Sequence, residues 1–419
     1  MSSPAESVSG LVDHLFRRKS GEMVAALTRT FGPARLDLVE EVVQEAMIAA
    51  LTTWPFHGVP ENPGGWLFRA ARNRALDRLR RERTAAAHAE SERETDRSEA
   101  FAIRPAVEDD QLRLVFLCCA PEIPPEARVA LTLKLVCGFS VDEIARALLA
   151  EPAAIAQRIV RAKRTIREQR IAMDVPAESR VLRERIDVVL DVLYLLFNEG
   201  HSASAGEDLV RVEVAEEAIR LATVLTSAPA TDLPAARALR ALMLFHAARF
   251  PARRGATGDV ILLREQDRAL WNRARIAEAF REFDRSLEGD RLTRFHVEAA
   301  IAAVHAEAAS FDATDWPRLL GLYDQLLEIA PSPVVLLNRS VVLARLHGPA
   351  AAVEALQDLA SDARLRRYPL LPALLADYWI ELDERAKAEA YLERALEMPM
   401  SEPERRLLER KREACRHAR

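Results

Sequence analysis

The chain has 419 residues, of which 49% are hydrophobic and 29% charged, and its formal net charge is −5. This balance excludes a disordered or fibrous protein, and no apolar run reaches the roughly 18 residues that a membrane helix needs. Four cysteines, two of them adjacent at positions 118 and 119, are too few for a disulfide scaffold and predict a reducing, cytoplasmic setting. Only 14 glycines, with abundant Ala, Leu, Glu and Arg, predict an all-α protein.

Charge is concentrated in three blocks of alternating sign. Residues 66–83 carry seven arginines against two acids, residues 84–110 carry eight acids against three arginines, and residues 156–170 carry six basic residues against one acid. Basic blocks on helices are typical of nucleic-acid binding, although a solvated helix face gives the same pattern. The acidic block has no sustained apolar period, which predicts a linker.

The first predicted domain, residues 8–83, is a set of helices. Asp37 and Glu40 have the spacing of a capping box at a helix start. Apolar residues follow at helical spacing from Val39 to Ala50 and predict a buried stripe. Another face of the same helix is acidic and carries Glu41, Gln44 and Glu45.

Residues 54–63 contain three prolines and are expected to form a loop. Asn62 then caps a second helix with Pro63 at its first position, where a missing N–H costs little. An aromatic ring beside arginines can stack on exposed bases and hold phosphates, and an asparagine can read a base edge. By spacing, one side of this helix carries Trp66, Arg69, Asn73 and Arg80.

The second predicted domain, residues 111–172, has the pattern of a helix-turn-helix. Ser140 and Glu143 form a capping box, and a tight break precedes a longer helix over residues 152–170. Its buried stripe is Ile155, Ile159, Ala162 and Ile166. Its open face is basic, as in helices that read the major groove, and carries Ala154, Gln157, Arg158 and Arg161.

Residues 176–419 are predicted to be an α-helical, repeat-like array. Tyr323, Leu356 and Leu392 occupy like places, 33 and 36 residues apart, close to the period of about 34 of a tetratricopeptide repeat. Such arrays form concave surfaces that bind a protein or peptide partner. Residues 171–419 carry a net charge of −6, which disfavours DNA binding by this segment.

Motifs for chemistry are absent from the sequence. There is no phosphate-binding loop, no His-Glu-x-x-His and no Cys-x-x-Cys. We therefore predict no catalytic residue, no metal and no cofactor. One alternative stays open, an enzyme or small-molecule sensor in the second half with His201, His296 or His305 at its site.

Three segments together resemble region two of the extracytoplasmic-function sigma factors: 40–46, 62–67 and 71–81. Residues 141–167 resemble region four of the same family. Residues 193–200 and the weak repeat resemble the subgroup with a C-terminal tetratricopeptide-like extension.

This resemblance implies a sigma factor that directs core RNA polymerase to −35/−10 promoters and has no enzymatic activity. Its implied partners are core RNA polymerase and promoter DNA, without a membrane. The implied −10 contacts are Trp66, Arg69, Arg72, Asn73 and Arg80. The implied −35 contacts are Ala154, Gln157, Arg158, Arg161 and Arg164. The implied polymerase contacts are Glu41, Gln44 and Glu45.

The expected organisation has two small sigma domains, 8–83 and 111–172, joined by the acidic linker 84–110 and followed by the extension 176–419. The family threads the linker through the polymerase cleft, and we expect the extension to be regulatory, as a scaffold or as a mask. The alternative is a stand-alone helix-turn-helix regulator with a ligand- or metal-sensing C-terminal domain, which would leave the features of residues 37–81 unexplained.

Overall fold

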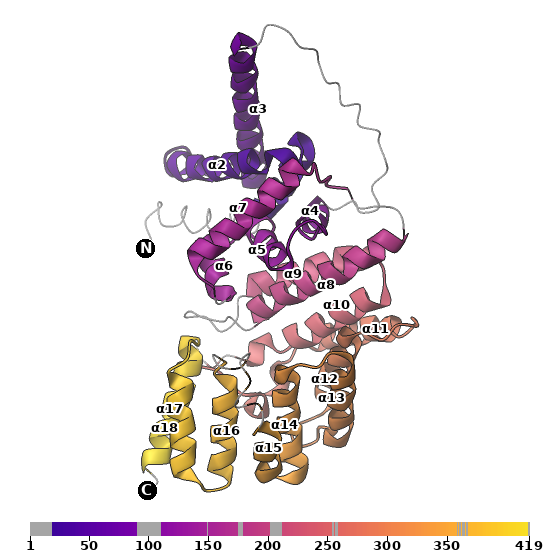
Figure 1. Cartoon of the computed structure of the whole chain (residues 1–419), viewed down its shortest axis with the longest axis vertical. Helices are drawn as coiled ribbons and strands as arrows, with labels where there is room; N and C mark the ends of the chain where they lie inside the picture. Colours follow the sequence, from indigo (N-terminus) through magenta and orange to yellow (C-terminus); the bar gives the residue numbers. More distant parts are fainter. Residues whose placement is uncertain are drawn as a thin grey trace. The chain divides into compact units, whose positions relative to one another are not determined.

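The structure is a computed structural model that describes residues 19–89, 110–148, 150–174, 179–201, 212–253, 255, 259–357, 359, 362, 365 and 368–417 (Figure 1). Its regular elements are helices, and no β-strand occurs within these ranges, so the all-α prediction is confirmed. None of the helices in the described ranges is both long and apolar enough to cross a membrane.

The chain divides into two compact units. The first comprises Met1–Leu195 with Ser227–Thr231, and the second comprises Leu196–Thr226 with Asp232–Arg419. Residues 19–31 of the first unit are helical. Its further elements are η1 (Pro33–Arg35), α2 (Leu36–His57), α3 (Pro63–Ala89), α4 (Asp110–Cys118), α5 (Pro125–Leu135), α6 (Val141–Ala147), α7 (Pro152–Glu168) and the first part of α8 (Ser179–His201).

Helix α2 is longer than the sequence predicted and packs along α3. It continues through Pro55 to His57, so the expected loop over residues 54–63 is wrong at its start. Trp54 explains the difference: its side chain is only 2% exposed, and its ring packs edge-to-face on Trp66, with centroids 5.6 Å apart. The apolar stripe of α2 therefore extends one turn further, and the helix ends at Gly58, whose φ of 83° favours glycine.

Two of the three predicted helix caps are confirmed. The Asn62 side chain accepts a 2.8 Å hydrogen bond from the Gly65 amide. The Ser140 hydroxyl accepts from the Glu143 amide at 3.2 Å, and Glu143 accepts in return from the Ser140 amide at 2.8 Å.

The capping box predicted at Asp37 is wrong. Helix α2 begins at Leu36, directly after η1, so Asp37 lies inside the first turn and caps nothing. Its carboxylate is instead paired with Lys163 and Arg167 of α7.

Helices α5, α6 and α7 pack against one another as the predicted helix-turn-helix. Helix α4 lies beside α5 and is buried on every side. The first part of α8 belongs with these helices, since Arg185 donates a 2.5 Å hydrogen bond to the Phe116 carbonyl and its guanidinium lies 5.7 Å from the Phe116 ring centroid. The predicted linker falls on residues 84–89 of α3 and on 90–109, which lie outside the described residues.

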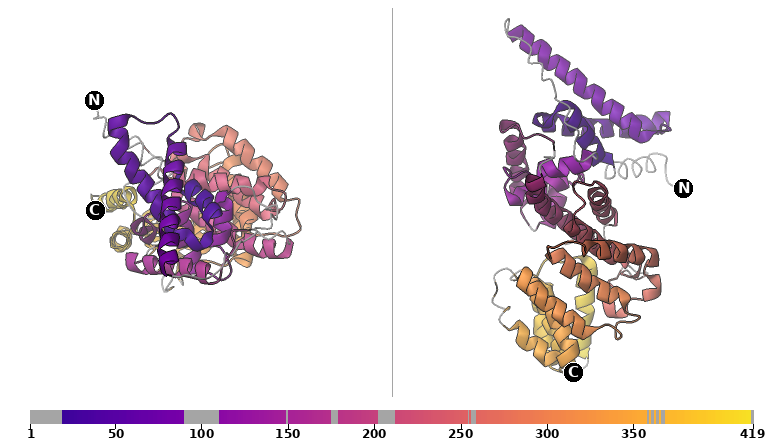
Figure 2. Two further views of the ribbon diagram at one scale, coloured as in Figure 1. Left: turned by 90° about the horizontal axis from the view of Figure 1, so that it is seen from above. Right: turned by 90° about the vertical axis from the view of Figure 1, so that its right-hand side faces the viewer.

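The second unit continues with helices that each pack on their chain neighbour from α12 to α18 (Figure 2). Separate apolar clusters fill its interior, for example around Leu337 and Leu356, and around Ala388 and Leu392. The elements are α9 (Val212–Ser227), α10 (Pro234–Ala247), η2 (Phe250–Ala252), η3 (Leu263–Glu265), η4 (Arg268–Leu270), α11 (Arg273–Ser286), α12 (Arg294–Glu307), α13 (Trp316–Ile329), α14 (Pro333–His347), α15 (Pro349–Leu356), α16 (Leu370–Glu381), α17 (Arg385–Leu396) and α18 (Glu402–His417).

Candidate nucleic-acid interface

Helix α3 has a buried face and a basic face, as its spacing predicts. Leu67, Ala71 and Ala75 are fully buried and pack α3 against the rest of the first unit. Trp66, against Trp54, is half-buried, so only part of its ring is open to a base. The remaining predicted −10 residues are all exposed: Arg69, Arg72, Asn73 and Arg80.

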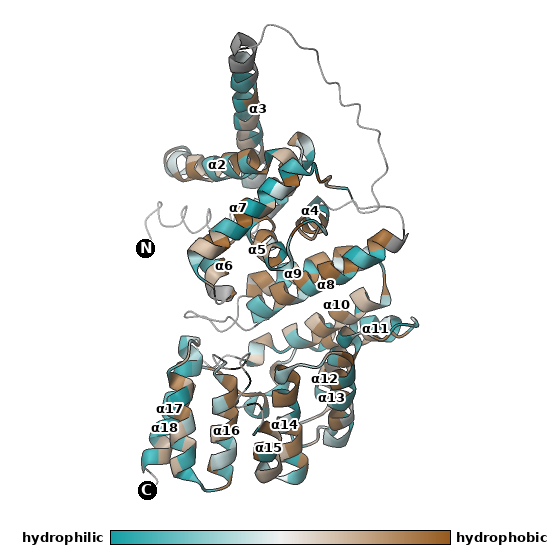
Figure 3. Cartoon of the chain, in the orientation of Figure 1, coloured by the Kyte–Doolittle hydropathy of each residue, from teal (hydrophilic) through white to brown (hydrophobic). Residues whose placement is uncertain are grey.

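Helix α7 is divided in the same way. Ile155, Ile159, Ala162 and Ile166 are buried, as predicted, and hydrophilic residues run along the helix in Figure 3. Of the predicted −35 residues, Ala154 and Arg158 are half-buried, whereas Gln157, Arg161 and Arg164 are exposed. Arg164 is paired with Glu168 at 3.1 Å.

Sequence reasoning missed one residue on the open face of α7. The Val160 side chain is 64% exposed, between Gln157 and Arg164 along the helix. A valine methyl at this position suits contact with a thymine methyl in the major groove. The sequence could have indicated Val160, because this residue falls outside the buried isoleucine stripe of the helix.

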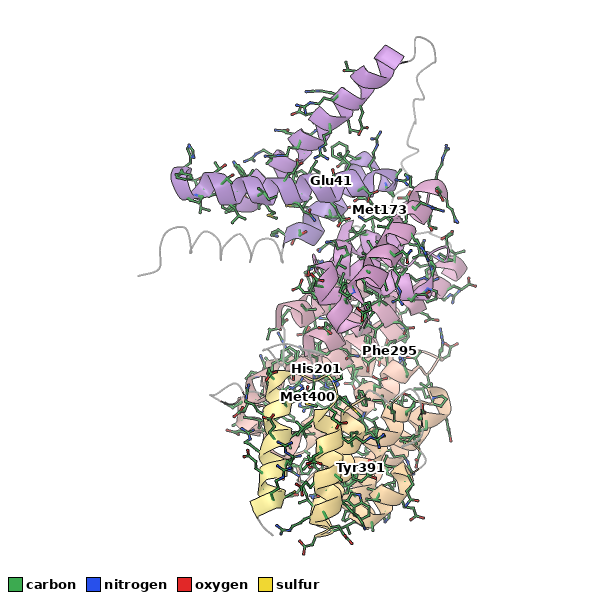
Figure 4. The ribbon with its side chains drawn as sticks, turned by 60° about the vertical axis from the view of Figure 1, so that its left-hand side comes forward. Glu41, Met173, His201, Phe295, Tyr391 and Met400 are labelled. Atoms are coloured by element: carbon green, nitrogen blue, oxygen red, sulfur yellow. The ribbon has the colours of Figure 1, made fainter. Side chains whose placement is uncertain are left out.

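The acidic face of α2 is partly neutralised by α3. Arg78 donates hydrogen bonds to both Glu41 and Glu45, and Arg74 lies 3.7 Å from Glu45. The bond to Glu41 raises the pKa of Arg78. Glu41, labelled in Figure 4, and Gln44 are exposed, whereas Glu45 is half-buried.

An apolar strip continues the α2 face. Ile48 is 60% exposed and Leu51 39%. They follow Gln44 at intervals of four and three residues, so the three side chains share one side of the helix. Exposed apolar residues grouped beside polar ones are typical of a protein-binding surface.

An ion-pair group joins α2 to α7 within the first unit. Lys163 Nζ lies 3.1 Å from Asp37 Oδ1 and also bonds Glu40, whose other oxygen lies 3.9 Å from Lys134 Nζ of α5. Burial acts to lower the pKa of Lys163, but the two carboxylates outweigh burial and raise it. Lys163 therefore contributes to packing rather than to the open basic face of α7.

The three candidate histidines differ in their surroundings. His296 is a buried capping residue, since its Nδ1 accepts from the Thr293 amide at 3.1 Å and its Nε2 lies 3.1 Å from the Ser286 carbonyl. His201 and His305 lie among arginines in the second unit. Across the described ranges, no three His, Cys, Asp or Glu side chains are grouped as a metal site would need.

Comparison with known families gives these faces a context. Residues 16–85 match Sigma-70 region 2, and residues 113–166 match Sigma-70, region 4. The chain therefore carries sigma-70 regions 2 and 4, which support a sigma factor. Its region 2 contains α2 and α3, and its region 4 contains the helix-turn-helix.

The rest of the chain matches a family of unknown function and an uncharacterized relative. Residues 185–287 match a family of unknown function, DUF6596. An uncharacterized protein of Rhizobium meliloti (strain 1021) is 37% identical over 395 residues, which cover 93% of this chain and 92% of the relative. The two proteins are therefore alike over the sigma domains and the extension together. No solved structure matches the chain.

Proposed function

We propose that the chain is a sigma factor of the extracytoplasmic-function type, which recruits core RNA polymerase to −35/−10 promoters. The observation that carries this proposal is that both sigma regions present an exposed basic helix face opposite a fully buried stripe. Arginines on such faces can neutralise phosphates and contact base edges.

For polymerase, we propose the face of α2 made of Glu41, Gln44, Glu45, Ile48 and Leu51. Arg78 already pairs with both Glu41 and Glu45, which partly neutralises the two carboxylates. The apolar side chains beside them, Ile48 and Leu51, therefore supply much of the binding energy for polymerase. This division resembles other protein interfaces, in which apolar residues are central and charges set orientation.

For DNA, the two basic faces have different tasks in the proposal. The −10 strand contacts Trp66, Arg69, Arg72, Asn73 and Arg80 on α3, and the partly open Trp66 ring supplies a stacking surface. The −35 duplex contacts Ala154, Gln157, Arg158, Arg161 and Arg164 on α7, together with Val160. Arg161 is exposed, while Arg164 shares its charge with Glu168.

The acidic linker 84–110 is proposed to follow the polymerase cleft, where its negative charge resembles that of RNA. The extension is proposed to be a tetratricopeptide-like regulatory scaffold that binds a protein or peptide partner. Consecutive packing from α12 to α18 supports this proposal, because repeat arrays bury their apolar faces between neighbours.

The scaffold proposal has a direct test. Deletion should follow Leu195 rather than the end of α7, because the first part of α8 packs on Phe116. Lower transcription from a cognate promoter supports a scaffold, and higher transcription supports a mask instead.

The sigma-factor proposal is tested by copurification of the full chain with core RNA polymerase, followed by mapping of the DNA that the complex binds. We expect a stoichiometric complex and a shared −35/−10 pair upstream of bound start sites. A chain that binds duplex DNA but no polymerase would favour the stand-alone regulator.

A further inference from the structure

The second unit contains a group of basic side chains that the sigma-factor account does not use. They come from four places in the chain: the end of α8, α10 with the turn after it, η4, and the end of α12. We name this group the basic cluster, and its members are His201, His246, Arg249, Arg253, Arg268 and His305.

Direct contacts hold the basic cluster together. The His201 and His246 rings have centroids 4.8 Å apart, and Arg253 donates a 2.6 Å hydrogen bond to the His201 carbonyl. The Arg249 and Arg268 guanidinium groups both lie over the Trp271 ring, 5.4 and 4.6 Å from its centroid. His201 is labelled in Figure 4.

The arginines of the cluster have no carboxylate partner among the residues that the structure describes. Among the described residues, no carboxylate lies within salt-bridge distance of Arg249, Arg253 or Arg268, and Glu404 acts on Arg253 only through its field. Arginines earlier on α10 behave differently. Arg237 pairs with Asp232 and Glu282, and Arg240 pairs with Glu278 and Glu282.

Buried polar atoms of the cluster, and of Trp271 beside it, lack a hydrogen-bond partner among the described residues. Arg268 is only 8% exposed and Trp271 only 3%. Buried donors and acceptors are rarely left unpaired, because the loss of their hydration is costly. The unpartnered atoms are His201 Nε2, His246 Nδ1, Arg268 Nη2, Trp271 Nε1 and His305 Nδ1.

Helix ends account for part of this arrangement. Arg253 contacts the last carbonyl of α8, and Arg268 Nη1 donates to the carbonyls of His305 and Ala308 at the end of α12. Such carbonyls carry partial negative charge. Within the described part of the chain, these carbonyls leave Arg268 Nη2 and one nitrogen of each of the three imidazoles without a partner. Arg249 donates a 3.3 Å hydrogen bond to Gln266 Oε1.

Burial and mutual repulsion determine the protonation of the cluster. Burial, followed by the field of neighbouring arginines, lowers the pKa of His246 to about 3 and that of His305 to about 4, and it lowers the pKa of His201 as well. Burial also lowers the pKa of Arg249 to about 9. At neutral pH the imidazoles are therefore neutral and Arg249 is charged.

We propose that the basic cluster binds a small ligand through an oxyanion group, a phosphate or a carboxylate. Arg249 and Arg268 Nη2 supply charge-assisted donors, and the Trp271 N–H and neutral imidazoles supply further hydrogen bonds. Guanidinium groups held over an aromatic ring are already oriented for planar or tetrahedral oxyanions. This site lies in the second unit and does not depend on the sigma-factor assignment.

The test uses the full chain and three probe anions: sulfate, inorganic phosphate and succinate, each compared with chloride at equal ionic strength. Thermal unfolding and titration calorimetry report binding. We expect at least one probe to raise the unfolding midpoint in proportion to the logarithm of its concentration, as ligand linkage requires. The relative affinities for sulfate, phosphate and succinate distinguish a phosphate site from a carboxylate site.

Variants locate the binding. Arg249→Gln should weaken binding at least tenfold, and Arg249→Lys, which keeps the charge, should weaken it less. Arg281→Gln is the matched control, because Arg281 is exposed on α11, outside the cluster, and it should bind as the wild type does.

A second measurement does not depend on how the variants fold. An anion beside the cluster raises the histidine pKa values, so sulfate binding to the wild type near pH 5, closer to the pKa of His305, should be accompanied by proton uptake, visible as a buffer-dependent heat. No response to the three probes beyond that to chloride would overturn the proposal. An unchanged response in folded Arg249→Gln would do the same.

Discussion

Arg158 and Arg161 lie one turn apart on α7 but in different surroundings, since Arg158 is half-buried and Arg161 is exposed. We expect Arg161→Ala to reduce promoter binding by about 1–3 kcal/mol and to relax preference at one position, as the loss of a bidentate base contact does. Competition assays with single-base promoter variants measure this effect. Arg281→Ala, exposed in the second unit, is the control. Equal weakening on every sequence would reassign Arg161 to a phosphate.

Ile48 gives a separate test of the α2 face. Its side chain is 60% exposed, so Ile48→Ser should leave the free energy of unfolding within about 0.5 kcal/mol of wild type. Loss of its apolar contact should weaken polymerase binding about tenfold, which corresponds to about 1.4 kcal/mol. The two quantities are measured by denaturant unfolding and by competition for core polymerase. Normal polymerase binding by Ile48→Ser would remove Ile48 from the proposed surface.

Individual residues show what sequence reasoning could determine. The isoleucine stripe of α7 could be predicted because its residues recur at spacings of three and four within a single helix. The pairing of Asp37 with Lys163 joins residues 126 positions apart. A local sequence pattern cannot indicate a contact between residues so far apart in the chain. The capping box at Asp37 was a reasonable local prediction that a tertiary ion pair overrode.

Among the elements, α2 and α7 are linked through Lys163. Glu40 and Lys163 side chains are 12% and 13% exposed, so removal of the lysine leaves a largely buried carboxylate with only Lys134 nearby. Lys163→Ala should lower the free energy of unfolding of the first unit by about 1–3 kcal/mol. Arg164→Ala, which removes an exposed pair with Glu168, should change it by less than about 0.5 kcal/mol. Urea unfolding compares the two variants, and equal values would show that Lys163 is not structural.

The ends of elements were harder to predict than their buried faces. The prolines and Gly58 indicated a loop from Trp54, yet the helix continues to His57 because Trp54 is buried against Trp66. Helix α8 likewise crosses the border between the two units at Leu195, whereas the sequence placed a domain start near residue 176. The proposed domain boundaries and contact residues remain predictions.

At the scale of the molecule, acid should destabilise the second unit through its buried histidines. Their pKa values are lowered from about 6.5 in an unfolded chain, with His246 at about 3 and His305 at about 4. Their neutral forms favour folding above pH 6.5, and that stability is lost as pH falls toward 4, because the unfolded chain then binds more protons. From pH 7 to 5 we expect a loss of about 2 kcal/mol for each histidine.

The test variant for this prediction is His246→Asn. Its control is His57→Asn, because His57 is exposed on α2 of the first unit. Chloride buffers without polyvalent anions keep the basic cluster unliganded. Denaturant unfolding at several pH values should give a shallower pH dependence for His246→Asn alone. Identical slopes for the wild type and both variants would contradict the role given to His246.

The central claim concerns initiation of transcription, and it is tested most directly by run-off transcription with the purified full chain, core RNA polymerase and a promoter fragment from the mapped sites. We expect transcripts from one start site downstream of the −35/−10 pair, with output reduced by Arg161→Ala and by Ile48→Ser but unchanged by Arg281→Ala. Specific duplex binding by the chain with no start-site-specific transcript in the presence of core polymerase would contradict the account.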